Sequence, residues 1–424
     1  MGKRVGVNWV TKDARLLIAA SAIRALGQGF LSVSLAVYLA EIGLSLIEIG
    51  AFFTVGAAGV SFFALMVAFV SEKLGRRRLL VSLTLTSALA FVALIVTDNL
   101  VVLAVFAFLG ALSGGAGGAM GATQPLVQAS LAETATDARR TDTFALYRIV
   151  NTFSRAFGAL AAGLPLVIES QFGVSEVDSF KVVLGGLTAS LLLVALLYAL
   201  LAPPSAAERR GGWTNPLRLP NRRRIFILSG LFSVDSLGGA FLITSLAAYW
   251  FHTKFGFELA ELSLVFFASE LLTATSMWFA AKIANRIGLL NTMVFTHIPA
   301  SFFLLGAAFA PTAWLAVVFW QLRAFFSQMD VPTRDSYIMA VVNREERIAM
   351  ASMQQLGRSA ATTAGPSLST AMWTGISASA PFVATAVVKI AYDLSLWVMF
   401  KDVLPPEEIA RRERRERERN GASV

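Results

Sequence analysis

The chain has 424 residues, of which 56% are hydrophobic and only 15% are charged. Soluble domains carry about 25% charged residues, and the apolar runs that recur from Leu16 to Phe400 exceed what a soluble core can bury. The absence of cysteine excludes disulfides and thiolate metal sites, and two histidines are too few for a histidine-rich metal centre. We therefore expect a polytopic integral membrane protein with no metal and no cofactor.

Apolar runs of about 18 or more residues predict membrane-spanning helices. The first run contains Arg24 and no small-residue cleavage site follows it, so we interpret it as a span rather than a signal peptide. The glycine-rich stretch at 113–118 is assigned to the fourth span, because small residues allow membrane helices to pack closely. The twelve predicted spans are 15–41, 48–70, 79–97, 100–131, 142–168, 180–202, 225–251, 258–282, 290–309, 311–338, 348–376 and 380–401.

Basic residues gather before the first span and in alternate loops, and the opposite loops are mostly acidic. The positive-inside rule then places both termini in the cytoplasm. The net charge of +9 is explained by these clusters, which are topology signals and expected contacts with anionic lipid. We expect a monomer in the cytoplasmic membrane and no nucleic-acid partner.

Two segments of the chain match without a gap at an offset of 211 residues. Arg24–Tyr38 and Asp235–Tyr249 are identical at 8 of 15 positions, including Gly, Phe, Ser and Tyr. The first and seventh spans are therefore equivalent, which predicts two parallel six-helix pseudo-repeats. The expected domains are a first half at 1–202, a cytoplasmic middle loop at 203–224, a second half at 225–402 and a charged tail at 403–424.

A motif between the second and third spans carries a family resemblance. Ala68–Arg77 reads Ala-Phe-Val-Ser-Glu-Lys-Leu-Gly-Arg-Arg and resembles the Gly-x-Leu-Ala-Asp-Arg-x-Gly-Arg-Arg turn of the major facilitator superfamily. The resemblance implies an all-α integral membrane protein with twelve transmembrane helices, and a latch between conformations in which an acid at a helix end pairs with bases. A weaker copy of the motif follows the eighth span. The expected latch residues are Glu72, Lys73, Gly75, Arg76, Arg77, Asn285, Arg286 and Gly288.

The resemblance implies a secondary active transporter that moves a small solute by alternating access. Proton coupling is expected, and an efflux permease and an organic-anion transporter are both open. The chain has no Walker Gly-x4-Gly-Lys-Ser/Thr sequence and no His/Asp/Glu cluster of a membrane enzyme, so we expect it not to be an enzyme. A non-transporting receptor or lipid-handling protein on the same fold is the alternative.

Charged residues inside membrane spans usually face a cavity or a partner. Glu270, near the middle of the eighth span, is the proton-coupling candidate, and pairing with Arg323 or Arg358 is the alternative. The candidates for the substrate cavity are Arg24, Gln28, Arg155, Asp235, Arg323, Asp330 and Arg358.

Sequence spacing also suggests structural pairs among these charges. Lys389 and Asp393 are four residues apart, and Arg323 and Asp330 are seven apart, so each pair shares a helix face. We expect His297 to be a histidine with satisfied hydrogen bonds.

Arg24 and Asp235 hold equivalent positions in the repeat and are expected to lie opposite each other at the cavity. In the alternative, each pairs within its own half: Arg24 with helix-end carbonyls, and Asp235 with Arg323 or Arg358.

Overall fold

The computed structural model describes residues 10–114, 123–134, 140–202, 220–343 and 346–403, together with residues 405, 408, 409 and 413. Every regular element in these ranges is a helix, which confirms the all-α prediction. Eight of the described helical segments are long and apolar enough to cross a membrane, and the apolar helix at Leu100–Gly110 is shorter. The total of twelve spans stays a prediction.

The chain divides into two compact units. The first unit contains residues 1–211, 240–271 and 362–381, and the second contains the rest. The expected halves at 1–202 and 225–402 rest on the sequence repeat and stay a prediction.

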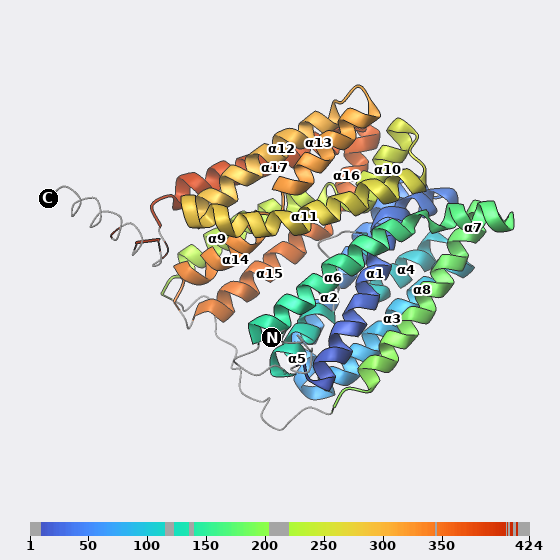
Figure 1. Cartoon of the computed structure of the whole chain (residues 1–424), viewed down its shortest axis with the longest axis horizontal. Helices are drawn as coiled ribbons and strands as arrows, with labels where there is room; N and C mark the ends of the chain where they lie inside the picture. Colours follow the sequence, from blue (N-terminus) through green and yellow to red (C-terminus); the bar gives the residue numbers. More distant parts are fainter. Residues whose placement is uncertain are drawn as a thin grey trace, which may run out of the picture. The chain divides into compact units, whose positions relative to one another are not determined.

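Most of the first unit is an antiparallel bundle (Figure 1). Its helices are α1 (Lys12–Glu41), α2 (Leu46–Leu74), α3 (Arg76–Val96), α4 (Leu100–Gly110), α5 (Gln124–Thr134), α6 (Arg140–Leu160), η4 (Ala161–Gly163), α7 (Leu164–Phe172), α8 (Glu176–Ala199), α10 (Thr244–Phe255) and α16 (Gly365–Gly375). The beginning of α11 (Leu259–Ile287) also belongs to it.

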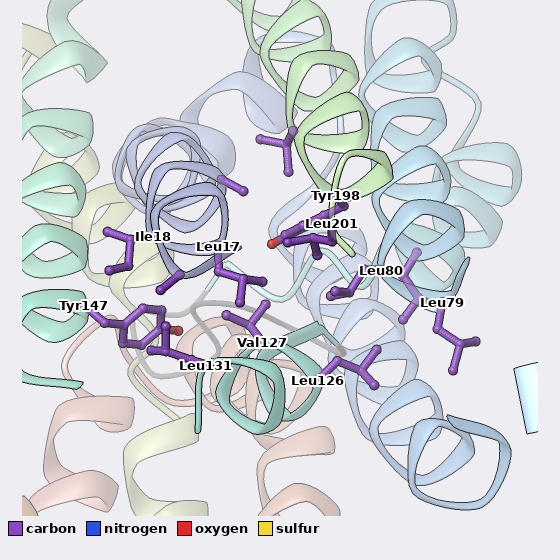
Figure 2. Packing of buried hydrophobic residues seen from close by; sticks show 14 of the residues in the cluster. Leu17, Ile18, Leu79, Leu80, Leu126, Val127, Leu131, Tyr147, Tyr198 and Leu201 are labelled. Atoms are coloured by element: carbon purple, nitrogen blue, oxygen red, sulfur yellow. The ribbon is translucent and has the colours of Figure 1, made fainter. Parts of the chain in front are cut away.

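Glycine allows close helix packing in the first unit. Helices α1 and α6 cross at Gly29, where a Cβ atom would lie 2.0 Å from the carbonyl oxygen of Arg155. Only glycine permits this approach of two backbones. Figure 2 shows a buried cluster nearer the N-terminal end of α1, in which Leu17 lies between Tyr147 of α6 and Tyr198 of α8.

The second unit is built around α9 (Arg222–Ala240), most of α11, and five further helices. These are α12 (Leu289–Ala308), α13 (Ala313–Phe326), α14 (Asp330–Val341), α15 (Arg347–Thr363) and α17 (Ala380–Phe400). Phe232, Tyr337 and Leu396 are fully buried in its core.

Several predicted spans are broken into shorter helices. The fifth is divided into α6, η4 and α7, and Pro165 stands in the first turn of α7. The eleventh is divided into α15 and α16, and Pro366 stands in the first turn of α16. Proline lacks the N–H that continues the helical hydrogen bonds and clashes with the preceding turn, which favours a break before Pro165 and Pro366. The break is not obligatory, because α12 continues through Pro299.

Candidate functional site: a polar cavity and two groups of buried charges

A cavity in the first unit is bordered by α1, α2, α3, α8 and the end of α4. Its empty volume is about 850 Å³, including its open mouth. Arg24 and Gln28 line it and are four residues apart on α1, so both project from one helix face. Two of the predicted cavity residues are thus placed together on one wall.

Arg24 is held from one side only. Its Nη1 donates to the Thr84 hydroxyl at 3.2 Å, and that hydroxyl donates to the Leu80 carbonyl at 2.7 Å. This partner is a side-chain hydroxyl rather than the helix-end carbonyls of our alternative. The Arg24 Nε and the Gln28 Oε1 are buried, and neither has a hydrogen-bond partner in the described ranges.

Arg155 and Glu270 form the second feature of the first unit. Arg155 on α6 donates from Nε and Nη2 to one carboxylate oxygen of Glu270 on α11, at 2.9 and 2.6 Å. The side chains are 19% and 13% exposed. The alternative partners of Glu270, Arg323 and Arg358, were therefore wrong: the sequence carries no information on which of several arginines approaches a carboxylate from another helix.

Small residues, all but one with a hydroxyl group, join α2 to the end of α15 and to α16, and we name residues 50, 54, 61, 363, 367 and 370 the closing contact. The hydroxyls of Thr54 and Ser367 are 2.8 Å apart, and the Ser367 N–H donates to Thr54 Oγ1 at 3.0 Å. A Cβ atom on Gly50 would lie 2.0 Å from Thr370 Oγ1. The helices therefore meet through small polar side chains without interlocking large ones.

The second unit contains a buried ionic cluster centred on Asp235. Lys389 donates to its Oδ1 at 2.7 Å, and Arg334 donates to its Oδ2 at 3.3 Å. Arg334 also donates to Asp330 at 3.0 Å. Arg323 and Arg358 were expected to pair with Asp235, and Arg323 with Asp330, and these pairings were wrong. Arg334 takes this place, because it lies four residues from Asp330 on the same helix face.

His297 and Asp393 complete this cluster. The His297 Nδ1 lies 3.1 Å from both carboxylate oxygens of Asp393, and its Nε2 lies 3.4 Å from Lys389 Nζ. The prediction of a satisfied histidine agrees with this geometry. The expected Lys389–Asp393 ion pair was wrong. Lys389 contacts Asp235 of α9 instead, and Asp393 contacts His297 of α12.

The remaining predicted cations form no ion pair with these groups in the described ranges, although Arg358 lies close enough to Arg334, Asp235 and Asp330 to interact with their charges. The Arg323 guanidinium lies over the Trp320 ring, 4.6 Å from its centroid. Arg358 is half-buried on α15. Arg334 was missed as a candidate, although its spacing of four residues from Asp330 was a usable signal.

The latch motif is described in part. Gly75 and Gly288 both have positive φ, +81° and +94°, so both copies of the motif turn at glycine as their sequences require. Arg76 forms an ion pair with Glu133, and Arg77 donates to the Leu201 carbonyl at 3.2 Å.

Other parts of the latch prediction stay open. The side chains of Glu72 and Lys73 lie outside the described residues. Arg286 is exposed in the last turn of α11, which also contains Asn285. In the second copy, the Leu289 N–H donates to Glu408 at 2.6 Å, a partner that sequence spacing alone did not indicate.

In the part of the chain that the structure describes, no group of three or more His, Asp or Glu side chains is arranged to hold a metal ion. The cavity and the two groups of charges can hold a solute or exchange a proton.

Comparison with known proteins gives the family. The sequence model of the Major Facilitator Superfamily matches residues 17–327 and 236–423. An uncharacterized membrane protein of Saccharomyces cerevisiae, YJR124C, is 23% identical over 434 residues, covering 93% of this chain and 95% of the yeast protein.

Three solved structures with similar folds are distant from this chain in sequence. The nucleoside transporter NupG matches with a TM-score of 0.72 at 14% identity, over 92% of this chain and 100% of that one. A bacterial homologue of the human lysosomal transporter Spinster matches with a TM-score of 0.71 at 16% identity, over 96% and 100%. The peptide-family transporter PepTSo matches with a TM-score of 0.72 at 12% identity, over 92% and 98%. The chain is a multi-pass membrane transporter and belongs to the Major Facilitator Superfamily.

Proposed function

We propose that this transporter is a proton-coupled secondary carrier that moves a small solute across the cytoplasmic membrane by alternating access. The observation that carries the proposal is the partly buried pair of Arg155 and Glu270, which joins helices from the two sequence repeats. Such a pair has a neutral total charge only while Glu270 is ionised. A proton on Glu270 removes the negative charge that Arg155 contacts, and taking one member of a partly buried ion pair away is costly in a low-dielectric site.

This charge balance supplies the coupling step. While Glu270 is ionised, it holds Arg155, and α6 and α11 stay joined. When Glu270 takes a proton, the guanidinium is released to water or to the solute, and the two helices can separate. The proton therefore selects between two arrangements of the helices, which is the requirement for coupling.

The closing contact supports alternating access. Its contacts are hydrogen bonds between small hydroxyl groups, each of which contributes about 1 kcal/mol net. Water can replace each partner when the helices separate. A contact of this kind can form and break in every transport cycle, whereas interlocked large side chains would resist separation.

Reconstituted proteoliposomes containing a pH-sensitive dye test the proposal. Solutes are first chosen by thermal stabilisation of the purified protein, since a ligand that binds the folded state raises the unfolding temperature. We expect an imposed proton gradient to drive solute accumulation in wild type. The Glu270→Gln variant should lose accumulation and retain solute exchange. Unchanged pH-dependent accumulation in Glu270→Gln would reject the role of Glu270, and binding without any flux would favour a receptor.

A further inference from the structure

The cavity in the first unit contains an arginine whose charge is not balanced by any described neighbour. Arg24 has no ion pair in the described ranges, and its one hydrogen bond is to the neutral hydroxyl of Thr84. Arg155, Lys389 and Arg334, by contrast, all contact carboxylates. Arg24 is half-buried and faces the cavity, so its charge is available to water or to an anionic ligand in that cavity.

The free edge of the guanidinium defines the shape of that partner. The Arg24 Nη1 donates a hydrogen bond to the Thr84 hydroxyl. The opposite edge of the guanidinium carries Nε and Nη2, and no described residue accepts a hydrogen bond from it. Arg155 uses this same Nε–Nη2 edge to hold the Glu270 carboxylate. The edge of a guanidinium matches the spacing of carboxylate oxygens, and such charge-assisted bonds are the strong ones in proteins.

The hydroxyls that line the cavity leave this edge open. Ser32, Ser87 and Ser190 each donate to a backbone carbonyl, and none of them accepts a hydrogen bond from Arg24. The Gln28 Oε1 is buried without a partner one helical turn from Arg24 and can accept a hydrogen bond from a ligand. The cavity therefore offers one cationic donor edge beside one neutral amide.

The rest of the wall is apolar. Leu31, Leu35, Phe63, Leu83, Phe91 and Leu191 face the same space. A ligand with an apolar body releases water from these surfaces, which contributes about 25 cal/mol per Å² of apolar area. A strongly hydrated inorganic anion could use the guanidinium, but it would gain nothing from these side chains.

We infer that Arg24 and Gln28 form the head-group site for a soluble organic carboxylate with an apolar body, and that such acids are the substrate class of this transporter. The inference rests on the proposed transport function. In this arrangement, the carboxylate lies on the Nε–Nη2 edge of Arg24, and the apolar body extends along α1 and α3.

Three probes with one body and different head groups test the inference. They are 4-phenylbutyrate, 4-phenylbutan-1-ol and 4-phenylbutylamine, and the measurement is displaceable binding of tritiated 4-phenylbutyrate to the full chain in phosphatidylcholine nanodiscs. We expect the acid to compete and the amine not to. Equal competition by acid and amine would overturn the inference, and this comparison requires no variant.

Two variants and one control locate the site. Arg24→Gln should weaken binding of 4-phenylbutyrate about 10- to 100-fold, the range for a lost charge-assisted hydrogen bond. Gln28→Glu places a carboxylate one turn from Arg24, so it should occupy the free edge, raise the unfolding temperature and abolish binding. Arg148→Gln, at an exposed position on α6, should bind like wild type. Unchanged affinity in both cavity variants would overturn the assignment.

Lipid composition separates a soluble acid from an anionic lipid. An affinity for 4-phenylbutyrate that stays unchanged when the nanodisc contains phosphatidylglycerol would show that the site serves soluble acids. Displacement of 4-phenylbutyrate by phosphatidylglycerol would show that the inferred substrate class is wrong. Binding requires no proton gradient. Acid binding without gradient-driven accumulation would therefore reject proton coupling alone, and accumulation of other solutes without acid binding would reject the head-group site alone.

Discussion

Arg155 Nη2 and Glu270 Oε2 lie 2.6 Å apart, although the two residues are separated by 115 positions in the sequence. The bond joins α6, in the first sequence repeat, to α11, in the second. A contact that depends on the charge of one carboxyl group is thus located between two helices that would have to move in the proposed alternating-access cycle.

The first prediction concerns the stability of this pair. Glu270→Gln removes the carboxylate charge that Arg155 contacts and should lower the free energy of unfolding by up to about 3 kcal/mol. The double variant with Arg155→Gln should recover part of that loss, because the cation that lost this carboxylate is removed as well. Equilibrium unfolding in mixed micelles measures both, with Arg148→Gln as the control. Strictly additive losses would show that the two side chains are not coupled.

The second prediction concerns the closing contact. Gly50→Ala introduces a methyl group that would overlap Thr370, so it should prevent close approach of α2 and α16 and slow transport. Thr370→Gly removes the overlapping atoms and should restore transport in the double variant. Gly185→Ala, where a Cβ atom meets nothing within 4 Å, is the matched control. Solute flux in proteoliposomes is the measurement, and wild-type flux in Gly50→Ala alone would contradict a functional closing contact.

The third prediction concerns Asp235. Its two carboxylate oxygens contact Lys389 and Arg334, so Asp235→Asn should destabilise the protein by about 3–5 kcal/mol, the range for a broken buried ion pair. Asp335→Asn, the same substitution at an exposed position of α14, should change stability little. Thermal unfolding compares the two variants.

The fourth prediction concerns a charge swap between the repeats. Because Asp235 already has partners in its own unit, the swap Arg24→Asp with Asp235→Arg should be no more active than the single variants. The measurement is solute flux in proteoliposomes, for the swap and for each single variant. Higher activity of the swap would instead support the direct Arg24–Asp235 pair that the repeat suggests.

The fifth prediction concerns pH and the Glu346 carboxylate, which accepts hydrogen bonds from the Asn221 amide, the Asn221 N–H and the Asn343 N–H. Burial alone would raise its pKa, but these bonds outweigh burial and hold the pKa of Glu346 below its ordinary value of 4.5. The resulting stability is present above the ordinary pKa and is lost as the pH falls through the lower folded-state pKa.

Glu346→Gln therefore tests this contribution. The unfolding temperature of the variant should be below that of wild type at about pH 6, and the difference should shrink as the pH falls below the ordinary value of 4.5. Asp98→Asn, at an exposed acid, should show no such convergence. A constant difference across the range would contradict a pH-dependent role.

The sequence by itself determined the class of protein, the internal repeat, and the glycine turns that end the two copies of the latch motif. Long apolar runs establish a membrane protein because the bilayer leaves few alternatives to helices. The 211-residue offset between Arg24–Tyr38 and Asp235–Tyr249 is a property of the sequence alone. Gly75 and Gly288 could be predicted as turns because each follows an apolar helix, and glycine adopts positive φ without steric cost.

The tertiary structure alone decided which charges meet. Sequence spacing offered Lys389–Asp393 and Arg323–Asp330, but the structure pairs Lys389 with Asp235, Asp393 with His297 and Asp330 with Arg334. Helical periodicity shows which residues share one helix face, and it does not show which helices are neighbours or how each is rotated. Partner choice depends on a few ångströms between helices, because the interaction of charges at low dielectric changes steeply over that distance.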